Sequence, residues 1–97
     1  MPRPRKKRCC RRFDGDRIMK PRGIPMTEVQ IIHLGLDELE AMRLCDLEGY
    51  EQIDAGTKMQ VSRGTVQRLL KSGRAKTARA ILESAALVIG DPGGEHV

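Results

Sequence analysis

The link Gln60-Val61-Ser62 constrains the fold of this chain more than any other feature, because it separates two helix-forming segments by very few residues. The segment before it, residues 51–59, has small or apolar side chains at Ile53, Ala55, Gly56 and Met59. Ser62 is a favoured N-cap residue, and it predicts a helix that starts at residue 63. Two helices joined so closely must cross steeply, with Val61 between them. The sequence therefore predicts a helix-turn-helix.

Gly56 lies inside the first of these two helices. A glycine in a helix interior costs about 1 kcal/mol relative to alanine. Either another part of the chain approaches Gly56 so closely that a Cβ would obstruct it, or the residue is a neutral replacement of alanine. The sequence leaves both interpretations open.

A third helix is predicted at residues 38–48, within LDELEAMRLCDLEG. Asp37 and Glu40 have the spacing of a capping box, Leu36 is the preceding hydrophobic residue, and Gly49 is a left-handed stop. Its apolar side chains are spread around much of the helix: Leu39, Ala41, Met42, Leu44, Cys45 and Leu47. A helix of this kind must pack against partners on more than one side.

The rest of the chain predicts only short strands and flexible ends. Residues 17–19, 29–34 and 86–89 are rich in branched aliphatic side chains and are short enough for strands. Phe13 and Tyr50 are the only aromatic residues, which favours helix packing over a β-sandwich. We therefore expect a mainly α fold, a three-helix helix-turn-helix domain with a few short accessory β-strands. The expected divisions are a disordered basic arm at 1–12, a loop with short strands at 13–35, the helix-turn-helix domain at 36–85, and a short strand and loose tail at 86–97.

Charge is divided into blocks along the chain. Residues 1–22 carry a net charge of +8 and residues 23–61 carry −6. Residues 62–82 contain six Lys or Arg and no acid, whereas residues 83–97 carry −3. Two basic segments separated by an acidic one indicate a polyanionic partner contacted at two places, and nucleic acid fits better than a membrane. The alternative is solvated charge that only maintains solubility.

The helix that starts at residue 63 has one apolar side and one cationic side. At 100° per residue, Val66, Leu69 and Leu70 fall on the side opposite most of the cations. Such a helix can enter the major groove of DNA, where a carboxylate would face phosphates. The predicted base-contacting residues are Arg63, Gly64, Gln67, Arg68 and Lys71. The predicted phosphate-contacting residues are Gln52, Ser62, Thr65, Arg74, Lys76 and Arg79.

The N-terminal arm is a second predicted contact with DNA. Its cations are Arg3, Arg5, Lys6, Lys7, Arg8, Arg11 and Arg12. Arginines of such an arm can enter a narrow minor groove, where the negative potential is concentrated. Gly73 interrupts the long helix and marks a bend, an end, or a point of tight packing against the helix at 38–48.

Four segments together resemble a known family: MPRPRKKR at the start, KPRGIP at 20–25, LDELEAMRLCDLEGY at 36–50 and MQVSRGTVQRLLKSGRAK at 59–76. This is an uncharacterised family of predicted prokaryotic DNA-binding proteins, whose helix-turn-helix is similar to region 4 of sigma-70-type sigma factors. The resemblance covers about residues 1–90, and it implies DNA binding and no catalytic residues. Gln60 stands where such turns usually have glycine, so a non-glycine residue must adopt φ > 0 at a cost on the order of 1 kcal/mol.

The leading hypothesis is therefore a sequence-specific, double-stranded DNA-binding transcriptional regulator. One alternative is a metal- or redox-sensing regulator, because Cys9 and Cys10 lie among cations that favour the thiolate and could join His33 or Cys45 as ligands. Another is a module that docks on RNA or on an acidic protein. An enzyme is not expected, and neither a cofactor nor a bound metal is predicted.

Partners and location follow from the same features. A single short helix-turn-helix offers limited contact with a groove, so a homodimer on a pseudo-palindromic site is expected, and the strands at 29–34 and 86–89 could pair within or between chains. The longest apolar run is AALVI at 85–89, so no membrane partner is expected. The three cysteines lack metal or redox spacing, which is typical of a reduced cytoplasmic protein.

Overall fold

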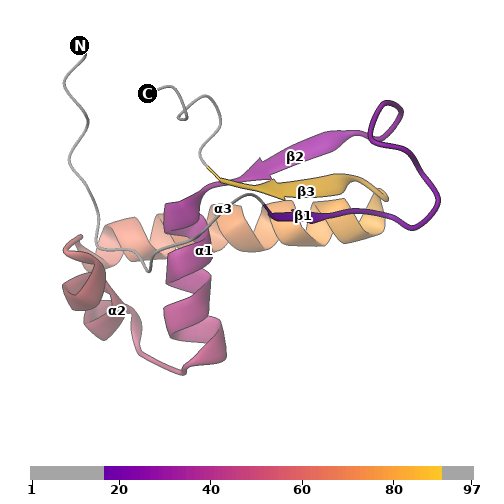
Figure 1. Cartoon of the computed structure of the whole chain (residues 1–97). Helices are drawn as coiled ribbons and strands as arrows, with labels where there is room; N and C mark the ends of the chain where they lie inside the picture. Colours follow the sequence, from indigo (N-terminus) through magenta and orange to yellow (C-terminus); the bar gives the residue numbers. More distant parts are fainter. Residues whose placement is uncertain (1–16, 91–97) are drawn as a thin grey trace, which may run out of the picture.

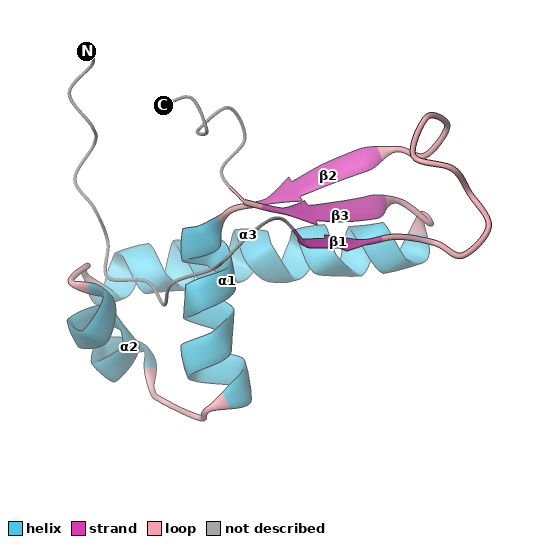
Figure 2. Cartoon of the chain, viewed as in Figure 1, coloured by secondary structure: helices cyan, strands magenta, loops and turns pink. Residues whose placement is uncertain are grey.

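The computed structural model describes residues 17–90, which form three α-helices and a small three-stranded sheet (Figures 1 and 2). The elements in chain order are β1 (Arg17–Met19), β2 (Ile31–Leu34), α1 (Leu36–Met42), a π-helical turn η1 (Arg43–Leu47), α2 (Gln52–Met59), α3 (Arg63–Leu82) and β3 (Ala86–Ile89). The prediction of a mainly helical chain with a few short strands is confirmed. The predicted basic arm at 1–12, residues 13–16 and the predicted tail at 91–97 lie outside the described residues.

A tight turn joins α2 to α3. Gln60 ends α2 in the left-handed conformation, with φ 62° and ψ 41°, so the expected positive φ at a non-glycine residue is confirmed. The Val61 N–H then donates a hydrogen bond of 2.9 Å to the Gly56 carbonyl oxygen. Ser62 caps α3, because its Oγ accepts the Thr65 N–H at 3.1 Å. The predicted cap and the predicted place of Val61 between the helices are both confirmed.

Gly56 is required by this turn. A Cβ on Gly56 would lie 2.7 Å from the carbonyl oxygen of Val61, closer than real Cβ contacts allow. The crowding atom belongs to the backbone, so it cannot move aside as a side chain would. Of the two interpretations of Gly56, close approach of another part of the chain is correct.

The start of the first helix differs from the prediction. α1 begins at Leu36 rather than residue 38, its N-cap is Gly35, and the Gly35 N–H donates to Glu38 Oε1 at 2.8 Å. The predicted capping box of Asp37 with Glu40 is wrong, because Asp37 already lies in the first turn, where its Oδ1 accepts the Glu38 N–H. The helix ends in the π-helical turn η1, and Gly49 follows with φ 82°, as predicted for the stop.

α3 runs without interruption past Gly73, so neither a bend nor an end occurs there. A Cβ on Gly73 would lie 2.8 Å from Met42 Sδ and 3.3 Å from the Glu38 Cβ. Gly73 therefore lies where α1 crosses α3 closely. Of the three interpretations of Gly73, tight packing against the first helix is correct. In Figure 1 α1 passes across the middle of α3.

The three strands pair within the chain in the order β1-β3-β2. β1 is antiparallel to β3, with Arg17 opposite Ile89, and β2 is parallel to β3, with Leu34 also opposite Ile89. The segments predicted as strands at 29–34 and 86–89 therefore pair with each other within one chain, and they need no second chain to do so. The strand predicted at 29–34 is shorter than expected and begins at Ile31.

Two hydrophobic clusters pack against opposite halves of α3. The head cluster joins α1, η1, α2 and the first half of α3 through Ala41, Leu44, Ala55, Met59, Val66 and Leu70. The sheet cluster joins the strands to the second half of α3 through Leu34, Ala80, Ala85, Leu87 and Ile89. Met42 packs against both clusters. Because α3 is one continuous helix, the two clusters hold its two halves in a fixed relation.

Candidate nucleic-acid interface

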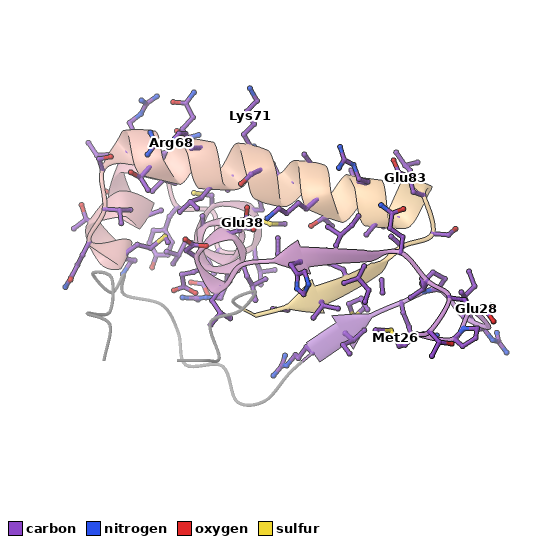
Figure 3. All side chains as sticks on the ribbon, turned by 90° about the horizontal axis from the view of Figure 1, so that it is seen from above. Met26, Glu28, Glu38, Arg68, Lys71 and Glu83 are labelled. Carbon is purple, nitrogen blue, oxygen red and sulfur yellow. The ribbon has the colours of Figure 1, made fainter. Side chains whose placement is uncertain are left out.

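The first half of α3 exposes one side and buries the other. Val66 and Leu70 are almost completely buried in the head cluster, and they fix the rotation of the helix about its axis. The side chains on the opposite side are exposed: Arg63, Gln67, Arg68 and Lys71. We call these four residues the cationic face. Figure 3 shows Arg68 and Lys71 pointing away from α1 and the sheet.

The six cations of α3 fall into two groups according to their partners. Arg74 forms an ion pair with Asp46 at 2.5 Å, Lys76 with Glu38 at 2.9 Å, and Arg79 lies 3.9 Å from Glu83. No carboxylate of residues 17–90 forms an ion pair with the other three, which are Arg63, Arg68 and Lys71. The unpaired cations are therefore those at the N-terminal end of α3, where base contacts were predicted.

The ion pair of Arg74 changes the expectation for that residue. Arg74 donates from Nε and Nη2 to the two carboxylate oxygens of Asp46, and these hydrogen bonds lower the pKa of Asp46 and raise that of Arg74. Arg74 was predicted to contact phosphate, and it must exchange Asp46 for phosphate in order to do so. Because both side chains are about half exposed, this exchange costs little.

Glu38 connects α1 to α3 at the crossing point. It is buried, and its carboxylate accepts hydrogen bonds from the Gly35 N–H at 2.8 Å, the Ser72 hydroxyl at 2.5 Å and the Lys76 ammonium at 2.9 Å. Burial alone would raise the pKa of Glu38, but the bonds from Ser72, Gly35 and Lys76 together lower it. Lys76 thus has a structural partner as well as its predicted role as a phosphate contact.

The N-terminal end of α3 presents small polar groups beside the cationic face. The Ser62 and Thr65 hydroxyls lie 3.0 Å apart, and Arg68 Nη2 donates to Thr65 Oγ1 at 3.2 Å. Gly64 differs from the other helical glycines, because a Cβ there would find its nearest neighbours at 3.9 and 4.0 Å. Nothing in the described part of the chain requires glycine at this position.

Gln52 occupies the first position of α2, as expected for a residue at the start of the helix before the turn. Its Oε1 is buried and accepts no hydrogen bond from the described residues. A phosphate needs a donor, so only the amide nitrogen of Gln52 could make the predicted contact.

Two further predictions concern cysteine and metal chemistry. Cys9 and Cys10 lie outside the described residues, so their sensing role stays a prediction. Cys45 is half-buried, and burial followed by the charge of Asp46 raises the pKa of its thiol. Between residues 17 and 90, no group of three His, Cys, Asp or Glu side chains is placed to hold a metal ion.

Sequence reasoning missed the acidic partners of α3. It treated Arg74, Lys76 and Arg79 as available cations, whereas Asp46 and Glu38 lie close to the first two. The signal was present in the acidic block at 23–61, which includes α1 and η1 and must neutralise part of the basic helix that it packs against.

None of the described helices is both long and apolar enough to cross a membrane.

The whole chain, residues 1–97, matches the family described as "Protein of unknown function DUF134". It is 48% identical over 89 residues to a "UPF0251 protein" of Pelotomaculum thermopropionicum, covering 92% of this chain and 67% of the relative. It is 46% identical over 92 residues to a "UPF0251 protein" of Shewanella sediminis, covering 92% of this chain and 93% of the relative. A relative from Rhodospirillum rubrum is 44% identical, and the match spans 92% of this chain and 62% of that protein. No solved structure matches the chain.

Proposed function

The chain belongs to the DUF134 family, and we propose that it binds double-stranded DNA in a sequence-specific manner through a helix-turn-helix formed by α2, the turn at Gln60 and α3. In this proposal α3 is the recognition helix, and the protein acts as a transcriptional regulator. The observation that carries the proposal is the set of cations at the N-terminal end of α3 that form no ion pair with a carboxylate of residues 17–90, on a helix whose opposite side packs in the head cluster.

The distribution of ion pairs supports a polyanionic partner. On the surface of an ordinary domain, positive side chains lie beside negative ones. Arg74, Lys76 and Arg79 follow this rule, because each lies beside a carboxylate. The same helix leaves Arg63, Arg68 and Lys71 without a carboxylate from the described residues. Cations on the first turns of a recognition helix are the ones that reach base edges, where Arg pairs with guanine, whereas Gln67 suits adenine.

Gly64 supports close approach of a partner. A glycine in a helix is less favourable than alanine by up to about 1 kcal/mol, and Gly56 and Gly73 are required by neighbouring atoms of the protein. At Gly64 the protein itself offers space for a methyl group. An external surface that meets the backbone of the first turn of α3, such as the wall of a DNA groove, accounts for the absence of a side chain.

Selection of bound fragments from random duplex DNA is the experiment that tests the proposal. An enriched motif should appear, and Arg63→Ala or Lys71→Ala should weaken binding to it by about 1–3 kcal/mol, or roughly 5- to 150-fold. Lys20→Ala is the matched control, because it removes one exposed positive charge on the sheet side of the chain. An equal loss of affinity in Lys20→Ala and Lys71→Ala would refute recognition by α3 and leave only attraction by net charge.

The predicted arm and the alternative partners are tested in the same assay. Removal of residues 1–12 should reduce the slope of log affinity against log salt by about 0.9 for each phosphate that the arm neutralises in the wild-type complex. Competition with double-stranded RNA distinguishes the RNA-docking alternative, which predicts that RNA displaces DNA at equal concentration. Metal analysis of protein purified without chelator tests the sensing alternative at Cys9 and Cys10.

A further inference from the structure

A groove of about 390 Å³ lies between β1 and the second half of α3. The end of β1 and the turn after it form one wall, and the last turns of α3 form the other. The start of β3 closes the groove on the inner side (Figure 1). The groove therefore lies on the half of α3 that packs against the sheet, and no residue of the cationic face lines it.

Small side chains leave this space open. Ala80 and Ala85 belong to the sheet cluster and are buried, and they line the groove together with Leu87. Met19 and Ile81 stand on the two walls and are 65% and 73% exposed, so neither side chain closes over the interior of the groove. The described chain therefore presents a concave apolar surface of the size that small-molecule sites have.

The polar groups of the groove favour a negatively charged ligand. Lys20 is the only charged residue that lines it, and its Nζ donates to the Pro21 carbonyl oxygen at 3.0 Å, which leaves two further N–H donors on the ammonium. No carboxylate of residues 17–90 forms an ion pair with Lys20. The Ser84 hydroxyl lines the same groove and has no hydrogen-bond partner within the described part of the chain.

Ser84 stands where a helix usually has glycine. It follows the C-cap of α3 and has φ 56°, in the left-handed region. Glycine is the common residue at this position of a helix end, and non-glycine residues held in this region are found disproportionately at ligand sites. A hydroxyl donor on the wall of the groove is what serine adds here.

We propose that the groove binds a small organic carboxylate with an apolar body, such as an arylalkanoic acid. The body packs against Ala80, Ala85 and Leu87, and the carboxylate accepts hydrogen bonds from the Lys20 ammonium and the Ser84 hydroxyl. Charge complementarity selects an anion, because Lys20 lines the groove and no acidic residue does. The same charge disfavours the basic segment 1–12 as the occupant. This site goes beyond the proposed DNA binding and does not depend on it.

NMR titration of the full, isotope-labelled chain with phenylbutyrate tests the proposal. Saturable shifts should appear at the amides of Met19, Ala85 and Leu87, with a dissociation constant of about 1 mM or below, and not at Arg63 or Lys71. Phenylbutanol has the same apolar body without the charge and should bind about fivefold more weakly. Absence of saturable shifts, or equal affinity for the alcohol, would overturn the proposal.

Two pairs of variants locate the site. Ile81→Asp should weaken phenylbutyrate binding by about 10-fold or more, because it replaces part of an apolar wall by a charge of the ligand's own sign. Leu82→Asp is its matched control, since Leu82 is the next residue and is 83% exposed but does not line the groove. Lys20→Met should reduce the affinity about fivefold, to that of the alcohol, whereas Lys58→Met, on α2, should bind as wild type does. Equal losses within either pair would contradict the assignment.

Two other occupants are distinguished by further measurements. Sedimentation equilibrium should give the same molecular mass for wild type with and without phenylbutyrate and for Ile81→Asp; a dimer that either change dissociates would show a second copy in the groove and overturn the proposal. Asp91→Asn combined with Glu95→Gln should leave the affinity unchanged, whereas a gain of about 10-fold would identify the segment 91–97 as the occupant. None of these measurements contains DNA, and the DNA assay of Lys20→Ala contains no carboxylate, so the two sites fail or succeed separately.

Discussion

Replacement of Glu38 by alanine tests whether the crossing of α1 over α3 depends on one carboxylate. The change removes the acceptor of three hydrogen bonds, from the Gly35 N–H, the Ser72 hydroxyl and the Lys76 ammonium. A hydrogen bond to a charged group contributes about 1.5–3 kcal/mol, but Lys76 is partly exposed and recovers most of its hydration. We therefore expect the free energy of unfolding to fall by about 3 kcal/mol, which lowers Tm by roughly 12–24 °C in a domain of this size.

Glu38→Gln separates charge from shape. Glutamine keeps one acceptor oxygen, so it should retain part of the network and cost about half as much as alanine. The difference in free energy of unfolding between wild type and Glu38→Gln should depend on pH, because the pKa of Glu38 is lower in the folded state. The stabilisation is complete above the unfolded pKa of about 4.3 and is lost as the pH falls through the lower folded pKa.

Urea unfolding followed by circular dichroism measures these differences at pH 7 and at pH 3. Glu28→Ala is the control, because Glu28 is exposed in the turn before β2 and lies far from Glu38 (Figure 3). It should change the free energy of unfolding by less than about 0.5 kcal/mol. The reasoning is refuted if Glu38→Ala costs less than about 1 kcal/mol, or if Glu38→Gln destabilises as much as Glu38→Ala.

Substitutions at three further positions test the glycines and the turn. Gly56→Ala should destabilise by about 1–3 kcal/mol in urea unfolding, because its Cβ would lie 2.7 Å from the Val61 carbonyl oxygen; an unchanged midpoint contradicts this. Gly64→Ala should raise the free energy of unfolding by up to about 1 kcal/mol and at the same time weaken DNA binding in fluorescence anisotropy; tighter binding would contradict the proposed approach of DNA. Gln60→Gly should stabilise by about 0.5–1 kcal/mol by relieving the left-handed φ of 62°, whereas Gln60→Ala should not, and equal effects in calorimetry would exclude backbone strain as the cause.

Much of the structure around the head cluster was predictable, because the sequence features that determine it are local. The Ser62 cap, the left-handed stop at Gly49 and the apolar spacing of Val66 and Leu70 depend only on nearby residues. The error at the start of α1 was also local: Asp37 and Glu40 have capping-box spacing, but Glu38 can reach back to Gly35 and does so. Sequence spacing alone does not decide which carboxylate reaches back to cap the helix.

The partners of the α3 cations were not predictable in the same way. Asp46 lies 28 positions before Arg74, and Glu38 lies 38 positions before Lys76, so these pairs depend on the crossing angle of α1 over α3. Likewise, the parallel pairing of β2 with β3 needs the whole helical region as a crossover connection. Short-range patterns locate elements, and only the packed chain shows which charges remain available.

The cationic face has a consequence for how such proteins diverge. Arg63, Gln67, Arg68 and Lys71 contribute to neither hydrophobic cluster, so exchanging any of them should leave stability within about 0.5 kcal/mol. Under the proposed function, substitutions on this face could therefore change the preferred DNA sequence without repacking the interior, and related chains could bind different DNA targets while retaining the same Gly56, Gly73 and Glu38.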